Sequence, residues 1–385
     1  MNRKTVLAAS TQCSVNIHIV SRIVDRSFKL GPAERTMFVK MMRKYEDFSG
    51  VEVRNFAILS NHVHLLVKVP PKNDDEMDDV EFLRRLSVIY EVDHMQGIER
   101  LLKECRKNHA TKAARELKES YTYRMGDISE FMKSLKQKFA RWYNKEHSRP
   151  GTFWDGRYSL TLVGEGHATK VVAAYIDLNP LRAGMVKDPA DYRWSSYGEA
   201  VEGKALAKKH LFSVMCSVEP GANDEFIAPE NEQEALTQYR MLLAYEGIAD
   251  DSDVQPALGQ KASTRKKRAK GFSSQEAAKI IKRGGSLTLS QMLRCKVRYL
   301  TSGFAIGSES FVNEVVAVIK KETGVFKDRK STASKIKHGG ASHIPGSSAI
   351  EPSGNLAGSA RAGHALSERQ LYSLRNIQKS PVQAE

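Results

Sequence analysis

The chain has 385 residues, 41% of them hydrophobic, and a formal net charge of +15. This length allows two or three domains with substantial cores. The positive charge favours a polyanionic partner, such as nucleic acid or an anionic membrane surface. No apolar run reaches the ~18 residues that a membrane span needs. The basic N-terminus continues directly into a strand-like run, so we interpret it as mature protein and not as a signal peptide.

The four cysteines are far apart in the sequence and include no C-x-x-C pair. They are Cys13, Cys105, Cys216 and Cys295. This spacing fits reduced thiols in a cytosolic protein, and a zinc site built on cysteine is not expected.

The first elements alternate between strand and helix. Pro32 and Gly50 stand at the start and just past the end of a helical pattern, where each residue is favoured. Asn61 lies between two strand-like runs and predicts a hairpin. In chain order, a strand, a helix and two strands are expected over 14–24, 31–50, 51–60 and 62–69.

A heavily charged segment over about 72–126 follows, with apolar residues at helical spacing, and predicts an insert of two helices. Asp127 then precedes a clear amphipathic helix, with Glu130 three residues on, which is typical of a capping box. The alternating run 156–164 predicts a fourth strand. The next helix, over 166–179, is expected to stop at Pro180.

The order strand, helix, two strands, helix, strand, helix favours an α+β fold with a ferredoxin-like antiparallel sheet. We assign this domain to residues 1–200. A helical extension over 201–254 and a basic linker with a small helical unit over 255–325 should follow. The tail, 326–385, is rich in Ser, Gly, Ala and Lys, and disorder is expected there.

Two histidines stand two apart in the run "AILSNHVHLLVKVP", residues 57–70. Successive strand side chains point to opposite faces, so His62 and His64 should project side by side, opposite Val63 and Leu65. Two imidazoles on one face can share a metal ion or an anion. They can also be two hydrogen-bonded edge residues, because His-x-His alone is a weak signal.

Three motifs between residues 151 and 197 carry a family resemblance: "GTFWDGRY", "YIDLNPLRAG" and "DYRWSSY". Together with "FAILSNHVHLLV" and "ISEFMKSLKQKFARWYN", they resemble the REP-associated tyrosine transposases. These are bacterial relatives of the small HUH single-tyrosine insertion-sequence transposases. "VRYLTSGFAIGSESFV", at 297–312, is similar to a feature of the longer members. The resemblance covers roughly residues 10–325, and its motifs are specific only in combination.

The resemblance implies a metal-dependent endonuclease and strand transferase with the HUH nuclease fold. It implies binding of single-stranded DNA, often a hairpin from a palindromic repeat, and cleavage of one strand through a 5′-phosphotyrosine intermediate. Tyr175 would be the nucleophile, and Mg²⁺ or Mn²⁺ would sit on His62 and His64 with Asn179 as polar partner. The protein would be cytoplasmic, nucleoid-associated and bacterial, with no membrane partner and with a homodimer left open.

The residues themselves allow this chemistry. Two imidazoles do not complete the site of an octahedral cation, so an oxygen ligand and waters are expected. Asn179 lies four residues after Tyr175, on the same helix face. Alternatively, Tyr175 is a core aromatic and Asn179 a helix C-terminal residue. We expect His18 to hydrogen-bond within the first strand and place it outside the site.

Several basic residues are candidate DNA contacts, with ion pairs or solvated surface as the alternative. They are Arg157, Arg182, Lys266, Lys267, Arg268, Lys296 and Arg298. Among the thirteen tyrosines, Tyr158, Tyr192 and Tyr197 are expected to be packing residues. The helical unit over 287–324 could anchor the protein on duplex DNA, as helix-turn-helix modules do, or could be a stabilising cap.

Three functions follow, in order of preference. The first is a DNA strand-transfer enzyme. The second is a DNA-binding protein derived from a transposase that cuts nothing, and intact His62, His64, Tyr175 and Asn179 argue against it. The third is a metal-dependent hydrolase in which water is the nucleophile, which would form no covalent adduct with DNA.

Overall fold

The computed structural model describes residues 16–69, 77–218, 228–247 and 305–323. Its centre is a five-stranded sheet in the order β2-β3-β1-β4-β5. The strands are β1 (Asn16–Arg22), β2 (Glu52–Ile58), β3 (His62–Lys68), β4 (Ser159–Val163) and β5 (Ala305–Ile306). The first four pair antiparallel, and with the helices between them they form the expected ferredoxin-like β-α-β-β-α-β unit.

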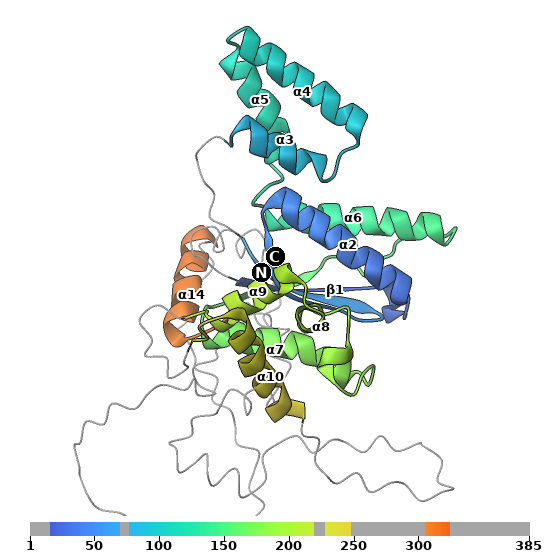
Figure 1. Ribbon diagram of the computed structural model, residues 1–385, viewed down its shortest axis with the longest axis vertical. Coiled ribbons are helices and arrows are strands. Elements are labelled where there is room, and N and C mark those ends of the chain that lie inside the picture. The colour runs from blue at the N-terminus through green and yellow to red at the C-terminus, as the bar shows by residue number, and fades with distance from the viewer. Residues whose placement is uncertain (1–15, 70–76, 219–227, 248–304, 324–385) are drawn as a thin grey trace, which may run out of the picture.

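Helices cover both faces of the sheet (Figure 1). On one face lie α2 (Pro32–Ser49) and α6 (Ile128–Glu146), and on the other lie α7 (His167–Arg182), α8 (Ser196–Val201), α9 (Ala205–Met215) and α10 (Glu232–Gly247). Short 3-10 turns, η1 (Val24–Arg26) and η2 (Pro189–Asp191), join elements at the rim. A hydrophobic core lies on each face of the sheet, and the side chains of β3 point alternately into the two. Val63 and Leu65 pack toward α2 and α6, and Leu66 packs toward α7.

The predicted helix ends of α2 and α6 are confirmed. Pro32 is the first residue of α2, and Gly50 follows its end in the left-handed conformation that glycine adopts without strain. The Asp127 side chain accepts hydrogen bonds from the backbone N–H groups of Ser129 and Glu130, which caps α6.

The insert between β3 and α6 holds three helices, where two were predicted. They are α3 (Asp79–Ser87), α4 (Val92–Lys107) and α5 (Thr111–Thr122), and they stand apart from the sheet beyond α2 and α6 (Figure 1). The chain turns between α4 and α5 at His109, whose φ of 50° ends the helical run. The insert has its own small core, which meets the main domain through Phe48 of α2.

The helix predicted over 166–179 corresponds to α7. The prediction that it stops at Pro180 is wrong, because α7 runs on to Arg182. Proline removes the N–H that would have bonded to the carbonyl of Ile176. The side chain of Asn179 compensates in part, since its Nδ2 donates to the carbonyls of Tyr175 at 2.7 Å and Ile176 at 3.5 Å.

The sheet also differs from a purely antiparallel one, because β5 runs parallel to β4. Within the described residues, α14 (Glu309–Thr323) is the helix that follows β5, and its Val312, Val315 and Ile319 are buried in the core under α2 and α6. Residues 305–323 therefore pack as part of the main domain, as the cap interpretation requires. The basic residues Lys266, Lys267, Arg268, Lys296 and Arg298 lie outside the described residues, and the DNA anchor stays a prediction.

The "DYRWSSY" motif closes the outer edge of β2. Tyr192 donates its hydroxyl to the carbonyl of Ile58 at 2.5 Å, and the N–H of Ile58 donates to the carbonyl of Trp194. Tyr192, Tyr197 and Tyr158 are all buried. This pairing covers an edge strand that would otherwise expose open backbone groups. Among the described residues, we find no helix that combines the length and the apolar character needed to cross a membrane.

Candidate active site

The face of the sheet under α7 brings together three of the predicted site residues. His62 and His64 project from β3, as their spacing predicts, and Tyr175 projects from the middle of α7. The ring centroids of His62 and His64 are 4.9 Å apart, and those of His64 and Tyr175 are 5.7 Å apart. Two strand residues and a helix residue more than a hundred positions later thus meet at one point.

His18 belongs to this group, and the expectation that it lies outside the site is wrong. Its Nε2 is 3.0 Å from Nδ1 of His64, and the two rings are stacked with centroids 5.3 Å apart. The His18 ring also meets the edge of Tyr175 at 6.1 Å. The hydrogen bond crosses from β1 to β3, because the register places Val20 opposite His64 and His18 one diagonal step away.

Both candidate ligand histidines have one ring nitrogen already engaged. Nδ1 of His64 pairs with His18, and Nδ1 of His62 lies 2.6 Å from Oδ1 of Asn61. Each therefore has its Nε2 left for another partner. A metal-bound histidine is commonly held by its other nitrogen in this way, which fixes the ring and its tautomer.

Burial keeps both rings neutral. Burial and, after it, the positive charge of Arg22 lower the pKa of His62 to about 4. The pKa of His64, which is 2% exposed, is held well below its ordinary value by burial and then by the other histidines. A neutral imidazole is the form that binds a metal.

Tyr175 is 5% exposed, and burial raises the pKa of its hydroxyl. Arg182, Asn179 and Arg22 act against this and lower the pKa. The Arg182 guanidinium carbon lies 5.5 Å from the centre of the Tyr175 ring. Arg22 projects from the end of β1, opposite His62. The sequence reasoning missed Arg22, although its place four residues after His18 puts both on one strand face.

A cavity of about 280 Å³ opens beside this group and is lined by Arg22, Arg26, Asn61 and His62. Two arginines at the mouth suit a phosphate, which a guanidinium can bind through two hydrogen bonds. Of the other candidate contacts, Arg182 lies at Tyr175, whereas Arg157 lies on the opposite side of the sheet, against α6.

Asp177, a buried residue of α7, anchors the helix that carries Tyr175. Its carboxylate accepts hydrogen bonds from the Asn55 side chain and the Tyr239 hydroxyl, both at 2.6 Å, and from the backbone N–H of Tyr197. These contacts tie α7 to β2, α8 and α10. Burial raises the pKa of Asp177 to about 6, in spite of the three donors. The sequence pattern did not single out Asp177.

Across the described ranges, no cluster of three or more His, Cys, Asp or Glu side chains is arranged to hold a metal ion. The two histidines would therefore form only part of a metal site, and the further ligands would have to be oxygen atoms of other kinds. Asn179 is a candidate for such an oxygen ligand. Its amide nitrogen donates a hydrogen bond to the helix backbone, so its side-chain oxygen is the atom that could bind a metal.

The chain is similar in sequence to one family of known proteins. Residues 11–76 and 120–179 match the family model described as "Transposase IS200 like". The unmatched stretch between them contains nearly all of α3, α4 and α5. No curated protein matches the chain significantly.

One solved structure, titled as a REP-associated tyrosine transposase bound to a REP hairpin, is 14% identical and has a TM-score of 0.32. The match covers 49% of this chain and 81% of that chain. A likeness at this level carries no weight beside the strand order and the family match. Both histidines and Tyr175 lie within the two segments that match the model of the IS200-like transposases, so the similarity to that family includes the predicted site.

Proposed function

We propose that this domain cuts and rejoins single-stranded DNA, with Tyr175 as the nucleophile. The observation that carries the proposal is the meeting of Tyr175 with His62 and His64 beside Arg22 and Arg182. A transposase of this family has DNA as its substrate, and the net charge of +15 suits that polyanion. A hairpin or palindromic repeat, as the motif resemblance implies, is the proposed specific target.

In the proposed step, the hydroxyl oxygen of Tyr175 attacks a backbone phosphorus. A new P–O bond forms to tyrosine, the bond from phosphorus to the 3′ oxygen breaks, and the phenol proton is lost as the 3′ oxygen gains one. The product is a 5′-phosphotyrosine and a free 3′-OH. Arg22 and Arg182 favour this step, because their charges stabilise both the phenolate and the phosphate oxygens.

His62, His64 and Asn179 are the residues that would hold a divalent cation, Mg²⁺ or Mn²⁺. The hydrogen bonds at both Nδ1 atoms and the neutral state of both rings support this fit. When bound, such an ion would act as a Lewis acid on a phosphate oxygen. Waters and DNA oxygens would complete its coordination.

The Tyr175→Phe variant tests the proposal. Phenylalanine keeps the packing of the ring and removes only the attacking oxygen. Wild-type protein with Mn²⁺ and a hairpin oligonucleotide carrying single-stranded flanks should form an adduct that survives denaturing electrophoresis. The variant should bind the oligonucleotide normally and form no adduct. Tyr143→Phe, a buried tyrosine on the opposite side of the sheet, is the control and should form the adduct.

The other functions give different results. Cleavage without an adduct, unchanged in Tyr175→Phe, would indicate a hydrolase that uses water. Binding without cleavage by wild-type protein, across a set of hairpin sequences and both metals, would indicate a DNA-binding protein without catalysis.

A further inference from the structure

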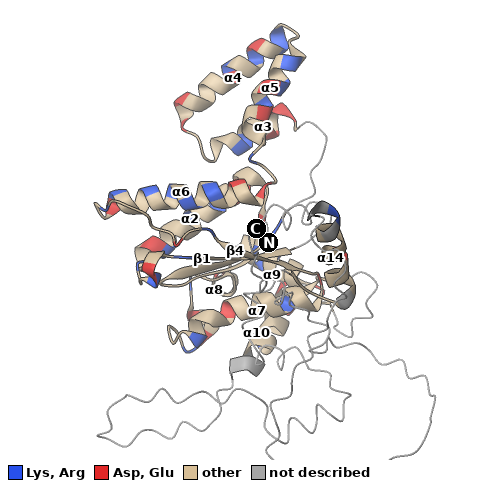
Figure 2. Cartoon of the chain, turned by 180° about the vertical axis from the view of Figure 1, so that it is seen from behind, with Lys and Arg blue, Asp and Glu red and all other residues tan. Residues whose placement is uncertain are grey.

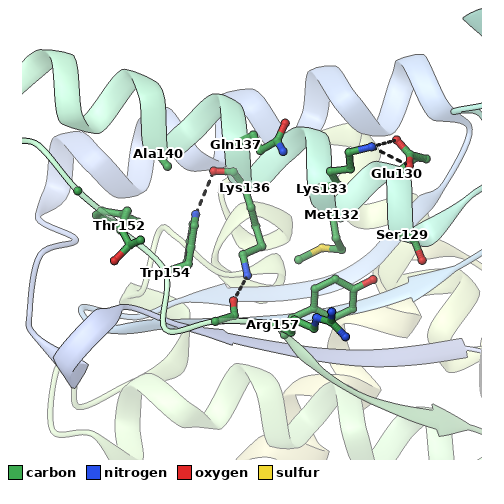
Figure 3. A pocket seen from close by; sticks show the side chains of 14 residues that line it. Ser129, Glu130, Met132, Lys133, Lys136, Gln137, Ala140, Thr152, Trp154 and Arg157 are labelled. Atoms are coloured by element: carbon green, nitrogen blue, oxygen red, sulfur yellow. Dashed lines mark hydrogen bonds and ion pairs between the residues drawn. The ribbon is translucent and has the colours of Figure 1, made fainter. Parts of the chain in front are cut away.

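A second and larger cavity, of about 610 Å³, lies on the other side of the sheet, between α6 and the loop 151–158 (Figure 3). Its volume is within the roughly 300–1,000 Å³ of sites that take small organic groups. None of the chemistry proposed above uses it. The loop is the "GTFWDGRY" motif, whose role the site at Tyr175 leaves unexplained.

The cavity has an apolar interior and a basic rim. Met132, Phe153 and Tyr158 are buried side chains that line it, and Trp154 completes the wall. Cations stand around this interior: Lys133, Lys136 and Arg157. The one acid in the lining, Glu130, pairs with Lys133 at 3.1 Å. The ribbon of α6 carries several blue segments in Figure 2, which mark its Lys and Arg residues.

Trp154 is held in place before any ligand arrives. Its indole N–H donates to the backbone carbonyl of Lys136 at 3.0 Å, and its backbone forms a bridge with Ile23. Nζ of Lys136 lies 5.3 Å from the centre of the Trp154 ring and 5.8 Å from that of Tyr158. A fixed aromatic ring beside a cation is the arrangement by which proteins hold an unpaired base and its phosphate.

The loop itself is built to hold this shape. Gly156 has a φ of +65°, a conformation that other residues rarely adopt, and its carbonyl accepts a hydrogen bond from Nζ of Lys136 at 2.9 Å. Figure 3 shows this bond and that of Trp154 fastening the loop to the helix.

The cavity is also attached to the strand end that carries Arg22. The N–H of Asp155 donates to the carbonyl of Arg22 at 2.8 Å, and the N–H of Val24 donates to the carbonyl of Phe153 at 3.0 Å. Arg22 points to the tyrosine site on one side of the sheet, and Trp154 lies against the next residue, Ile23. A single DNA strand that leaves the tyrosine site past Arg22 can therefore reach the cavity by passing around the end of β1.

We propose that this cavity binds one unpaired nucleobase of the DNA strand that flanks the cut, with Trp154 as the stacking platform. Lys133 and Arg157, at the rim of the cavity, contact the adjoining phosphates. The proposal rests on the proposed function, in that the occupant is the substrate of the same domain. It adds a base-binding site on the side of the sheet opposite Tyr175.

Tryptophan fluorescence tests the stacking directly, since the chain has only three tryptophans. The full chain carrying Tyr175→Phe, which removes cleavage, is titrated with an oligothymidylate of about 20 nucleotides. A matched oligomer with abasic sites and heparin serve as polyanions without bases. We expect quenching by oligothymidylate and little by the other two, because only a base stacks on the indole ring.

Trp154→Phe should remove that quenching and weaken binding less than tenfold, because phenylalanine keeps the packing and part of the stacking surface. Trp142→Phe and Trp194→Phe are matched controls and should retain the quenching. Lys133→Ala should lower the affinity and flatten its dependence on salt by about one phosphate contact. Lys138→Ala, an exposed lysine on the same helix that does not line the cavity, should change neither.

Quenching that persists in Trp154→Phe, or that heparin reproduces in full, would overturn the base site. So would equal effects of Lys133→Ala and Lys138→Ala on binding and its salt dependence. These readouts need no cleavage. A failure of the covalent chemistry at Tyr175 would therefore leave them unchanged, and the two proposals fail independently.

Discussion

Nε2 of His18 lies 3.0 Å from Nδ1 of His64, so a residue of β1 holds the ring of a residue of β3. The contact leaves only Nε2 of His64 for a ligand. A hydrogen bond between two neutral imidazoles needs one donor and one acceptor, and Nε2 of His64 is open to a metal only in the tautomer in which the Nδ1–H of His64 donates to Nε2 of His18. His18 is therefore a positioning residue for the proposed metal site.

His18→Ala should weaken metal binding about 10- to 100-fold, the usual cost of losing a group that holds a metal ligand. The measurement is Mn²⁺ affinity by calorimetry, together with the Mn²⁺ concentration that half-saturates cleavage. His210→Ala, a buried histidine outside the site, is the control. Unchanged Mn²⁺ affinity in a folded His18→Ala protein would assign His18 to packing alone.

Removal of the metal or of both histidines should abolish cleavage. EDTA should stop the wild-type reaction, and added Mn²⁺ should restore it. The double variant His62→Ala/His64→Ala should be inactive at any metal concentration, whereas Asn179→Ala should retain partial activity, since water replaces one oxygen ligand more easily than two imidazoles. Full cleavage in EDTA would show that these residues hold no required metal.

Truncation of Ile319 should destabilise the whole domain, because α14 packs in the core under α2 and α6. Ile319→Ala should cost roughly 2–5 kcal/mol in the free energy of unfolding. Urea unfolding followed through the tryptophans, which lie in the main domain, reports this loss. Asn313→Ala, on the exposed side of α14, should have little effect. An independent DNA-anchoring unit would instead leave that transition unchanged in Ile319→Ala.

The stability of the helical insert should depend on pH through Asp79. Hydrogen bonds from Arg106, and then from Lys118, hold the pKa of this carboxyl below its ordinary value of 3.8. A carboxyl with a lowered folded pKa stabilises the fold above its unfolded pKa, and this contribution is lost as the pH falls through the folded pKa.

Hydrogen exchange, corrected for its intrinsic rate, should show constant protection of α3–α5 from about pH 7 to 5 and a loss below about pH 4. Asp79→Asn should lower protection at neutral pH and remove most of this dependence. Glu119→Gln, which breaks an exposed pair with Arg115, should change little. The same acid-induced loss in Asp79→Asn as in wild type would assign it to other carboxylates.

Local pattern was enough to predict the four antiparallel strands, the helices α2, α6 and α7, and the direction of the key side chains. The two-residue period of a strand places His62 and His64 on one face, and Asp127 and Gly50 mark helix ends through bonds within a few residues of themselves. Such features depend on backbone geometry over one or two turns, which the sequence contains directly. The motif resemblance supplied Tyr175, which periodicity alone did not distinguish from a core aromatic.

The partners of those side chains depended on tertiary structure. His18 and Arg22 join the site because β1 lies between β3 and β4 in a particular register, and register is set by the packing of whole faces. Arg157 sits across the sheet from Tyr175 for the same reason. Residues 305–323 join the main domain because β5 pairs with the edge of β4 and α14 packs into the core under α2 and α6. Pairings between residues far apart in the chain leave no short-range trace in the sequence, so only the folded chain decides them.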